Sequence, residues 1–326
     1  MKIAALAFTD AGYQTGRRLA PLSGSYRLER CGPGMLKAWT EAAFAEADAL
    51  IYVGACGIAV RAIAPFVRSK TTDPCVLVVD EQGRYVIPVL SGHIGGGNEL
   101  AEAAAALIGA LPVVTTATDL NGLFAVDVWA RRHGLRIPDP SFIKRVSGKL
   151  LRGECVRFFT EFPISGSPPQ GVSADDGPPD VTVGIHRFDA PALHLVVPCV
   201  TAGIGCRKGM DAASIASAFS QALEEARLAP ECVAGCASVD LKKDEPGLLG
   251  FCSDRDLPFR TFSSETLSAL PGSYTSSDFV RSVTGTDSVC ERAAVAASGG
   301  DLIFRKHAYH GVTVAFAVSP VKLTWE

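Results

Sequence analysis

The feature that most constrains the fold is a repeated order of apolar run, short loop and helical pattern along the first 120 residues. Five short apolar runs predict strands, at residues 3–8, 49–53, 75–80, 85–90 and 111–116. Strong helix formers fill stretches between them, notably 34–47 and 99–110. Such alternation predicts an α/β fold, a three-layer α/β/α domain around a mostly parallel sheet.

A change of character near residue 137 divides the chain. We expect an N-terminal α/β domain over 1–136, a small, variable middle region over 137–192 and a second α/β domain over 193–326. The last of these contains a helix capped by Asp211 and closes with a hairpin over 301–317.

Composition excludes several classes of protein. With 48% hydrophobic and 20% charged residues, the 326-residue chain is typical of a globular enzyme, and its net charge of -3 argues against nucleic-acid binding. No apolar run approaches the ~20 residues of a membrane span, and the first is too short for a signal peptide, so we expect a cytoplasmic protein. The ten cysteines are scattered without a CxxC pair, and several lie in apolar runs, namely Cys75, Cys155 and Cys199. We therefore expect most of them to be small core residues in a reducing compartment, and we expect no metal site.

One loop, between the strand predicted at 85–90 and the helix predicted at 99–110, combines a histidine with closely spaced glycines. It contains Ser91, Gly92, His93, Gly95, Gly96, Gly97 and Asn98. Glycines allow a ligand to approach the backbone, and a helix start capped by Asn98 favours an anion. We expect His93 to act there as a general base or acid. The alternative is a plain strand-to-helix turn with a solvated histidine.

Other candidate binding residues follow predicted strands. Ligands of parallel sheets bind outside the carboxyl ends of the strands, so we expect these residues to converge there. They are Thr9, Gly54, Gly57, Arg61, Lys70, His93 and Asp119. Taken singly, Arg61 and Lys70 could be surface cations and Asp119 a helix cap.

A second glycine-rich loop contains Gly203, Gly205 and Arg207. Its spacing departs from the GxGxxG fingerprint, so neither a nicotinamide nor a flavin is expected there.

Six blocks in a fixed order resemble the cobalt-precorrin-5A hydrolases of anaerobic cobalamin biosynthesis. They lie at 54–65, 70–74, 90–98, 203–207, 237–245 and 288–294. Gly97 stands where that family more usually has alanine. The resemblance implies a cobalt-bearing, ring-contracted tetrapyrrole as substrate, whose ring-A δ-lactone is opened by water with release of acetaldehyde to give cobalt-precorrin-5B. It also implies that the cobalt belongs to the substrate, so we expect no protein metal or cofactor.

Roles for individual residues follow from this chemistry as hypotheses. We expect His93 to be the base, with Asp119 and Glu291 as secondary acid–base groups. The backbone N–H groups of 95–97 would face the oxyanion. Cations would anchor the acid arms of the substrate, namely Arg61, Lys70 and Arg207.

Three alternatives stay open at this point. The chain could be a non-catalytic corrinoid carrier of the same pathway, or a nucleotide-binding module. A nucleophilic Ser91 has little support, because the G-x-S-x-G elbow is missing. Candidate protein partners are neighbouring pathway enzymes and a second copy of the chain in a homodimer.

Overall fold

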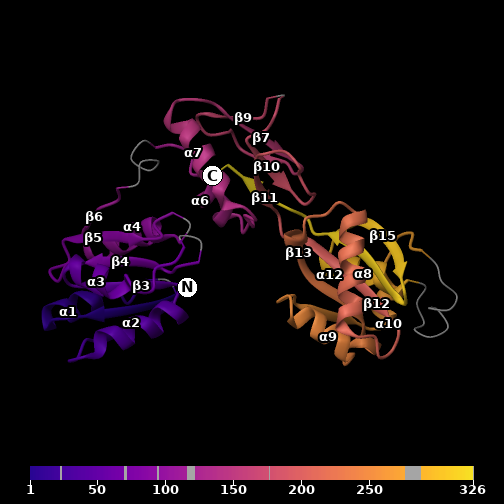
Figure 1. Cartoon of the computed structure of the whole chain (residues 1–326), viewed down its shortest axis with the longest axis horizontal. Coiled ribbons are helices and arrows are strands. Elements are labelled where there is room, and N and C mark those ends of the chain that lie inside the picture. Colours follow the sequence, from indigo (N-terminus) through magenta and orange to yellow (C-terminus); the bar gives the residue numbers. More distant parts are fainter. Residues whose placement is uncertain are drawn as a thin grey trace. The chain divides into compact units, whose positions relative to one another are not determined.

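The computed structural model describes residues 1–22, 24–69, 72–93, 95–115, 122–175, 177–275 and 288–325. Contacts divide the chain into two compact units (Figure 1). The first unit comprises 1–131 and 143–154, and the second comprises 132–142 and 155–326. The middle region predicted at 137–192 is therefore divided between the two units.

The first unit is built on a six-stranded sheet of order β2-β1-β3-β4-β5-β6. The strands are β1 (Lys2–Ala7), β2 (Ser25–Arg30), β3 (Ala49–Val53), β4 (Cys75–Val79), β5 (Tyr85–Leu90) and β6 (Leu111–Pro112). The helices are α1 (Asp10–Arg18), α2 (Met35–Glu46), α3 (Cys56–Ile63), α4 (Gly97–Ile108), α6 (Val126–Arg132, which ends one residue beyond the unit) and α7 (Ile143–Leu151). A mostly parallel sheet with covering helices confirms the predicted α/β class.

The two faces of this sheet are buried because its central strands are apolar on both sides. In β3, Ala49, Ile51 and Val53 pack with residues of α1 and α4. Leu50 and Tyr52 of the same strand point the other way and pack with residues of α2 and α3. The result is the three-layer arrangement expected from the sequence.

One strand runs against the others and separates the candidate residues. β5 is antiparallel to β4, and Leu90 at its end pairs with Val76 near the start of β4. The loop with His93 therefore begins at the edge where β4 starts, whereas the Gly54 loop follows the end of β3 at the opposite edge. The expectation that both loops converge at one edge is wrong, because a hairpin reverses the chain between β4 and β5.

The described residues of the second unit form three sheets. A parallel four-stranded sheet has the order β11-β10-β7-β9, a five-stranded sheet has the order β14-β13-β12-β16-β15, and two short strands, β17 and β8, pair with each other. Their strands are β7 (Val156–Thr160), β8 (Ile164–Ser165), β9 (Val172–Ser173), β10 (Val181–Gly184), β11 (Leu193–Val196), β12 (Val200–Cys206), β13 (Val233–Val239), β14 (Phe259–Phe262), β15 (Asp301–Tyr309), β16 (Val312–Val318) and β17 (Leu323–Thr324).

Helices α8 and α12 both pack on the five-stranded sheet. The helices of this unit are α8 (Ala212–Glu225), α9 (Pro246–Ser253), α10 (Ser264–Ser268) and α12 (Val289–Ser298), with short 3-10 turns η1 (Pro140–Phe142), η2 (Pro230–Cys232) and η3 (Asp240–Lys242). Asp211 caps α8, its Oδ1 accepting the Ser214 N–H at 2.8 Å, as predicted.

The closing hairpin is also confirmed. Strand β15 forms one edge of the five-stranded sheet, and its pairing with β16 shifts register twice, between Leu302 and Phe304 and between Phe304 and His307.

Two local expectations need correction. Helix α4 begins at Gly97 after Gly96, which has φ +74°, so Asn98 lies inside the helix and is not its cap. Cys155, expected in the core, is exposed, whereas Cys75 and Cys199 are buried. Within the described ranges, every helix is too short or too polar to cross a lipid bilayer.

Candidate functional site

The His93 loop is closed by its own backbone hydrogen bonds. Gly96 N–H donates to the His93 carbonyl at 2.9 Å, Gly97 N–H to the Ser91 carbonyl at 3.2 Å and Asn98 N–H to the Gly92 carbonyl at 2.9 Å. Two of the three glycine N–H groups expected to face an oxyanion are thus already engaged. The N–H groups of Gly96 and Gly97 are therefore used by the loop itself.

Close packing explains the glycines. A Cβ on Gly95 would lie 2.5 Å from the Ser91 Cβ, and one on Gly92 would lie 2.5 Å from the Asn98 Oδ1. A Cβ on Gly97 would lie 3.2 Å from the Ser91 carbonyl oxygen, tighter than ordinary contact. These positions hold the loop folded on itself, which fixes the backbone that carries His93.

His93 faces a carboxylate that the sequence did not single out. The Nδ1 of His93 lies 3.6 Å from Oδ1 of Asp127 in α6, and the side chains of His93 and Asp127 are 16% and 6% exposed. At that distance the contact is an ion pair when the ring is protonated, and slightly too long for a direct hydrogen bond. An acidic partner at Nδ1 orients the ring and favours its protonated form.

The Asp127 carboxyl is held in its ionised form. Burial raises its pKa, but the interaction with His93 and the backbone N–H groups of Asp127 and Val128 outweigh burial, so the pKa lies below its usual value. The ionised carboxylate favours the imidazolium that forms when His93 takes a proton. The pair can therefore act as a general base.

Two buried polar atoms, one in the His93 loop and one in α6, find no hydrogen-bond partner among the described residues. They are the Ser91 Oγ and the Arg131 Nε. The Ser91 backbone has φ +51°, a left-handed conformation that disfavours residues other than glycine. Arg131 forms an ion pair through Nη2 with Glu99, and a Cβ on Gly96 would lie 3.1 Å from its Nη1.

The remaining candidates of the first unit lie elsewhere or outside the described residues. Gly54 packs on Phe8, since a Cβ there would lie 2.6 Å from the ring, and Gly57 is exposed in the first turn of α3. Arg61 is exposed in the last turn of that helix. Lys70 and Asp119 lie outside the described residues.

The second unit contains a large cavity, which we call the basin. Its volume is about 960 Å³, near the upper end of small-molecule sites. The lining residues come from β12 and the following turn, the end of β13, η3 and the start of α9, α12, and the β15–β16 hairpin: Gly205, Cys206, Arg207, Lys208, Gly209, Val239, Leu241, Lys242, Asp244, Glu245, Pro246, Val289, Cys290, Lys306, Ala308, Gly311, Val312 and Thr313. Apolar walls with a few convergent charges suit a large amphipathic ligand.

The cations of the basin outnumber its carboxylates. Lys242 pairs with Glu245 at 3.0 Å, and the Gly209 N–H also donates to Glu245 at 2.6 Å. Within the described part of the chain, Arg207, Lys208 and Lys306 form no ion pair. These three cations are suited to an anionic ligand, and Glu245 holds the turn on which two of them lie.

The predicted residues of the second unit have different surroundings. Gly205 and Arg207 line the basin. Gly203 does not, because α12 packs directly on it: a Cβ there would lie 1.8 Å from the Cys290 carbonyl oxygen. Glu291 is fully buried, and its carboxylate accepts from the Thr275 N–H, the Thr275 hydroxyl and the Lys306 N–H at 2.6, 2.7 and 2.8 Å.

These contacts predict a pH-dependent stability. Burial raises the pKa of Glu291, but the hydrogen bonds, first from Lys306 and Thr275, outweigh it and lower the pKa. The contribution to stability is therefore present above the unfolded pKa of about 4.3 and is lost as the pH falls through the folded pKa. Urea unfolding of Glu291→Gln at neutral pH should show a loss of about 2 kcal/mol that shrinks in acid. An equal loss at every pH would contradict it.

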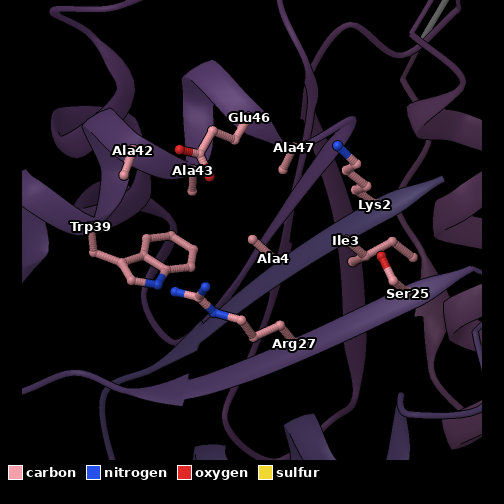
Figure 2. A pocket seen from close by; sticks show the side chains of 10 residues that line it. All are labelled: Lys2, Ile3, Ala4, Ser25, Arg27, Trp39, Ala42, Ala43, Glu46 and Ala47. Atoms are coloured by element: carbon pink, nitrogen blue, oxygen red, sulfur yellow. The ribbon is translucent and has the colours of Figure 1, made fainter.

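A smaller hollow lies in the first unit and contains none of the predicted residues. It has a volume of about 310 Å³ beside β1, β2 and α2, and Figure 2 shows the Arg27 side chain directed toward Trp39. Arg27 Nε donates to the Glu29 Oε1 at 2.8 Å, and the Trp39 Nε1–H donates to the same oxygen at 2.7 Å. The Arg27 guanidinium is thus already paired within the fold.

Sequence reasoning missed Asp127, Arg131, Lys242, Glu245 and Lys306. Asp127 and Arg131 meet the His93 loop across more than 30 residues of sequence, and no local pattern marks them. Lys242 and Glu245 carried a usable signal, since opposite charges three residues apart sit inside one of the recognised blocks.

Three family profiles match successive parts of the chain. They are described as Cobalamin synthesis G N-terminal, over residues 38–119, Cobalamin biosynthesis central region, over 124–195, and Cobalamin synthesis G C-terminus, over 200–317.

Two curated relatives match most of the chain. The cobalt-precorrin-5A hydrolase of Salmonella typhimurium is 34% identical over 97% of this chain and 97% of its own length. The enzyme of the same name from Priestia megaterium is 32% identical over 83% of this chain and 78% of its own. The chain therefore belongs to the cobalt-precorrin-5A hydrolase family.

Proposed function

We propose that this protein is a cobalt-precorrin-5A hydrolase, which opens the ring-A δ-lactone of its substrate and releases acetaldehyde to give cobalt-precorrin-5B. The observation that carries the proposal is the similarity to a curated enzyme of that name along 97% of both chains. The size and charge of the basin and the His93–Asp127 pair also support it.

The chemistry needs a base and no external oxidant. His93 takes a proton from water as the water oxygen attacks the lactone carbonyl, and the ring oxygen leaves as an alcohol after accepting a proton. The hydroxyl of the exposed hydroxyethyl group then loses its proton, and its carbon–carbon bond to the macrocycle breaks. The bonding electrons pass into the macrocycle, and the two-carbon fragment leaves as acetaldehyde. Asp127 keeps His93 oriented and favours its protonated form in each step.

The basin is formed by the second unit alone, and its charge suits the acid arms of a corrinoid. Arg207, Lys208 and Lys306 offer charge-assisted hydrogen bonds to carboxylates, and the apolar walls suit the ring. In this proposal the cobalt enters with the substrate and no cofactor of the protein takes part.

The basin yields a prediction for Arg207. Replacing it by alanine should weaken corrinoid binding by roughly tenfold, because one charge-assisted hydrogen bond contributes about 1.5–3 kcal/mol. The KM should rise while kcat changes little, since the guanidinium contacts an arm that does not react. Steady-state acetaldehyde release measures both constants. A variant with unchanged KM would remove Arg207 from the binding site.

The test of the function is direct. Purified protein is incubated with cobalt-precorrin-5A, and acetaldehyde is measured with an alcohol dehydrogenase while mass spectrometry follows the corrinoid. We expect acetaldehyde and cobalt-precorrin-5B in equal amounts. Tight binding of the corrinoid without acetaldehyde would instead support the non-catalytic carrier. Size-exclusion chromatography of the same sample tests the predicted homodimer.

A further inference from the structure

The unexplained feature of the first unit is the pair of buried polar atoms without partners beside His93. Ser91 lies in the loop itself and Arg131 in α6, and both side chains lie against the same short stretch of loop. A Cβ on Gly95 would touch the Ser91 side chain, and a Cβ on the adjacent Gly96 would touch the guanidinium of Arg131. Both atoms therefore border the backbone that links His93 to α4.

Such an arrangement is costly to keep. Leaving a buried donor without a partner is unfavourable, and Ser91 also holds a left-handed backbone that glycine would adopt without strain. A strained backbone with unsatisfied polar groups beside it is typical of ligand-binding sites. A ligand that relieves both atoms must accept hydrogen bonds, because the Arg131 Nε–H can only donate.

The charges around Arg131 indicate which kind of hydrogen-bond acceptor the site would bind. Arg131 is already paired with Glu99, and the Asp127 carboxylate lies against His93. A guanidinium that is already neutralised by Glu99 does not favour a further anion in the ground state. A neutral carbonyl oxygen that gains negative charge only during reaction fits better, because the donors then stabilise the transition state more than the bound substrate.

We propose that the Ser91 hydroxyl and the Arg131 Nε–H both donate hydrogen bonds to the lactone carbonyl oxygen. The inference rests on the proposed function and deepens it. When the water oxygen attacks the carbonyl carbon, the π electrons move to this oxygen and the proton goes to His93. As the ring carbon–oxygen bond breaks, the carbonyl re-forms and the proton passes to the departing oxygen. The engaged N–H groups of Gly96 and Gly97 give the loop its shape, and the side chains supply the donors.

The test compares Ser91→Ala and Arg131→Lys with the wild type. Lysine keeps a positive charge near Glu99 but lacks the Nε–H. Lactone opening is measured by mass spectrometry as the gain of one water. We expect each variant to lower kcat by roughly 10- to 100-fold with KM nearly unchanged, because these donors act on the transition state. Unchanged kcat in both variants overturns the proposal.

A third variant separates this role from a structural one. Ser91→Gly removes the hydroxyl but also relieves the left-handed backbone, so the protein should melt at a slightly higher temperature while kcat falls as in Ser91→Ala. Asp256→Gly is the matched control, since exposed Asp256 has φ +52° in the second unit. It should leave kcat unchanged. Wild-type kcat in Ser91→Gly overturns the proposal for the serine.

A binding measurement tests the two donors independently of the proposed function. Arginine labelled with ¹⁵N at Nε is incorporated, and the Arg131 signal is identified by its loss in Arg131→Lys. Adding δ-valerolactone, a simple neutral lactone, should shift this signal in the wild type and much less in Ser91→Ala. If the wild type does not act on cobalt-precorrin-5A, the proposed function is wrong, and the Arg131 signal is then the test of the two donors. A shift then supports the carbonyl site, and an unmoved signal overturns it.

Discussion

Replacing His93 by alanine is expected to lower acetaldehyde release by on the order of a hundredfold or more. The imidazole is the group placed to take the proton of the attacking water, and the nearby Asp127 carboxylate stabilises its protonated form. The loss should appear in kcat, measured under saturating substrate, because the ring acts on the reaction and not on the acid arms.

Two companion variants sharpen this result. Asp127→Asn keeps the shape of the side chain but removes the charge that favours the imidazolium, so it should lower kcat by roughly tenfold or more. His186→Gln removes a half-exposed imidazole that pairs with Glu161 at 3.0 Å in the second unit, and should leave kcat unchanged. Near-normal turnover by His93→Ala would remove the histidine from the mechanism.

Replacing Gly203 by alanine is expected to destabilise the second unit by about 3 kcal/mol, and to lower its melting temperature by about 10 °C. The new Cβ would sit 1.8 Å from the Cys290 carbonyl oxygen and 2.9 Å from the Ala294 Cβ. Backbone cannot yield as a flexible side chain does, so α12 must move away from β12. Thermal unfolding followed by circular dichroism measures the shift.

The matched control is Gly250→Ala, in helix α9 of the same unit. A Cβ there would lie 3.6 Å from the Ala212 Cβ, an ordinary contact, and alanine favours a helix over glycine. This variant should be as stable as the wild type or slightly more stable. A Gly203→Ala protein with an unchanged melting temperature would show that the helix shifts at little cost, contrary to the close packing described.

The sequence predicted the elements well where periodicity and caps were local. The strand at Tyr85–Leu90, the Asp211 cap and the closing hairpin are all set by neighbouring residues. The reversed direction of β5 was not predictable in this way, since a strand has the same pattern whether it runs with or against its neighbour. Because of this reversal, the His93 loop lies at the edge of the sheet opposite to the one predicted.

Only those parts of the candidate site that lie within a single loop were predicted from the sequence. His93 and the glycines around it were identified, because a titratable ring in a glycine-rich loop is a local signal. The partner of His93 was missed, since Asp127 reaches it only after the chain has folded. Asn98 was assigned as a helix cap from its residue type, but the cap is the left-handed Gly96, so the helix begins two residues earlier than predicted.

The two register shifts of β15 affect how the protein behaves at high concentration. A nine-residue outer strand offers unpaired backbone groups on which another chain could add a strand and start aggregation. Irregular pairing bends the strand and interrupts that row, while Arg305 and Lys306 place positive charges along it. We therefore expect the edge to protect the protein from strand-to-strand aggregation, so that a concentrated sample stays in solution.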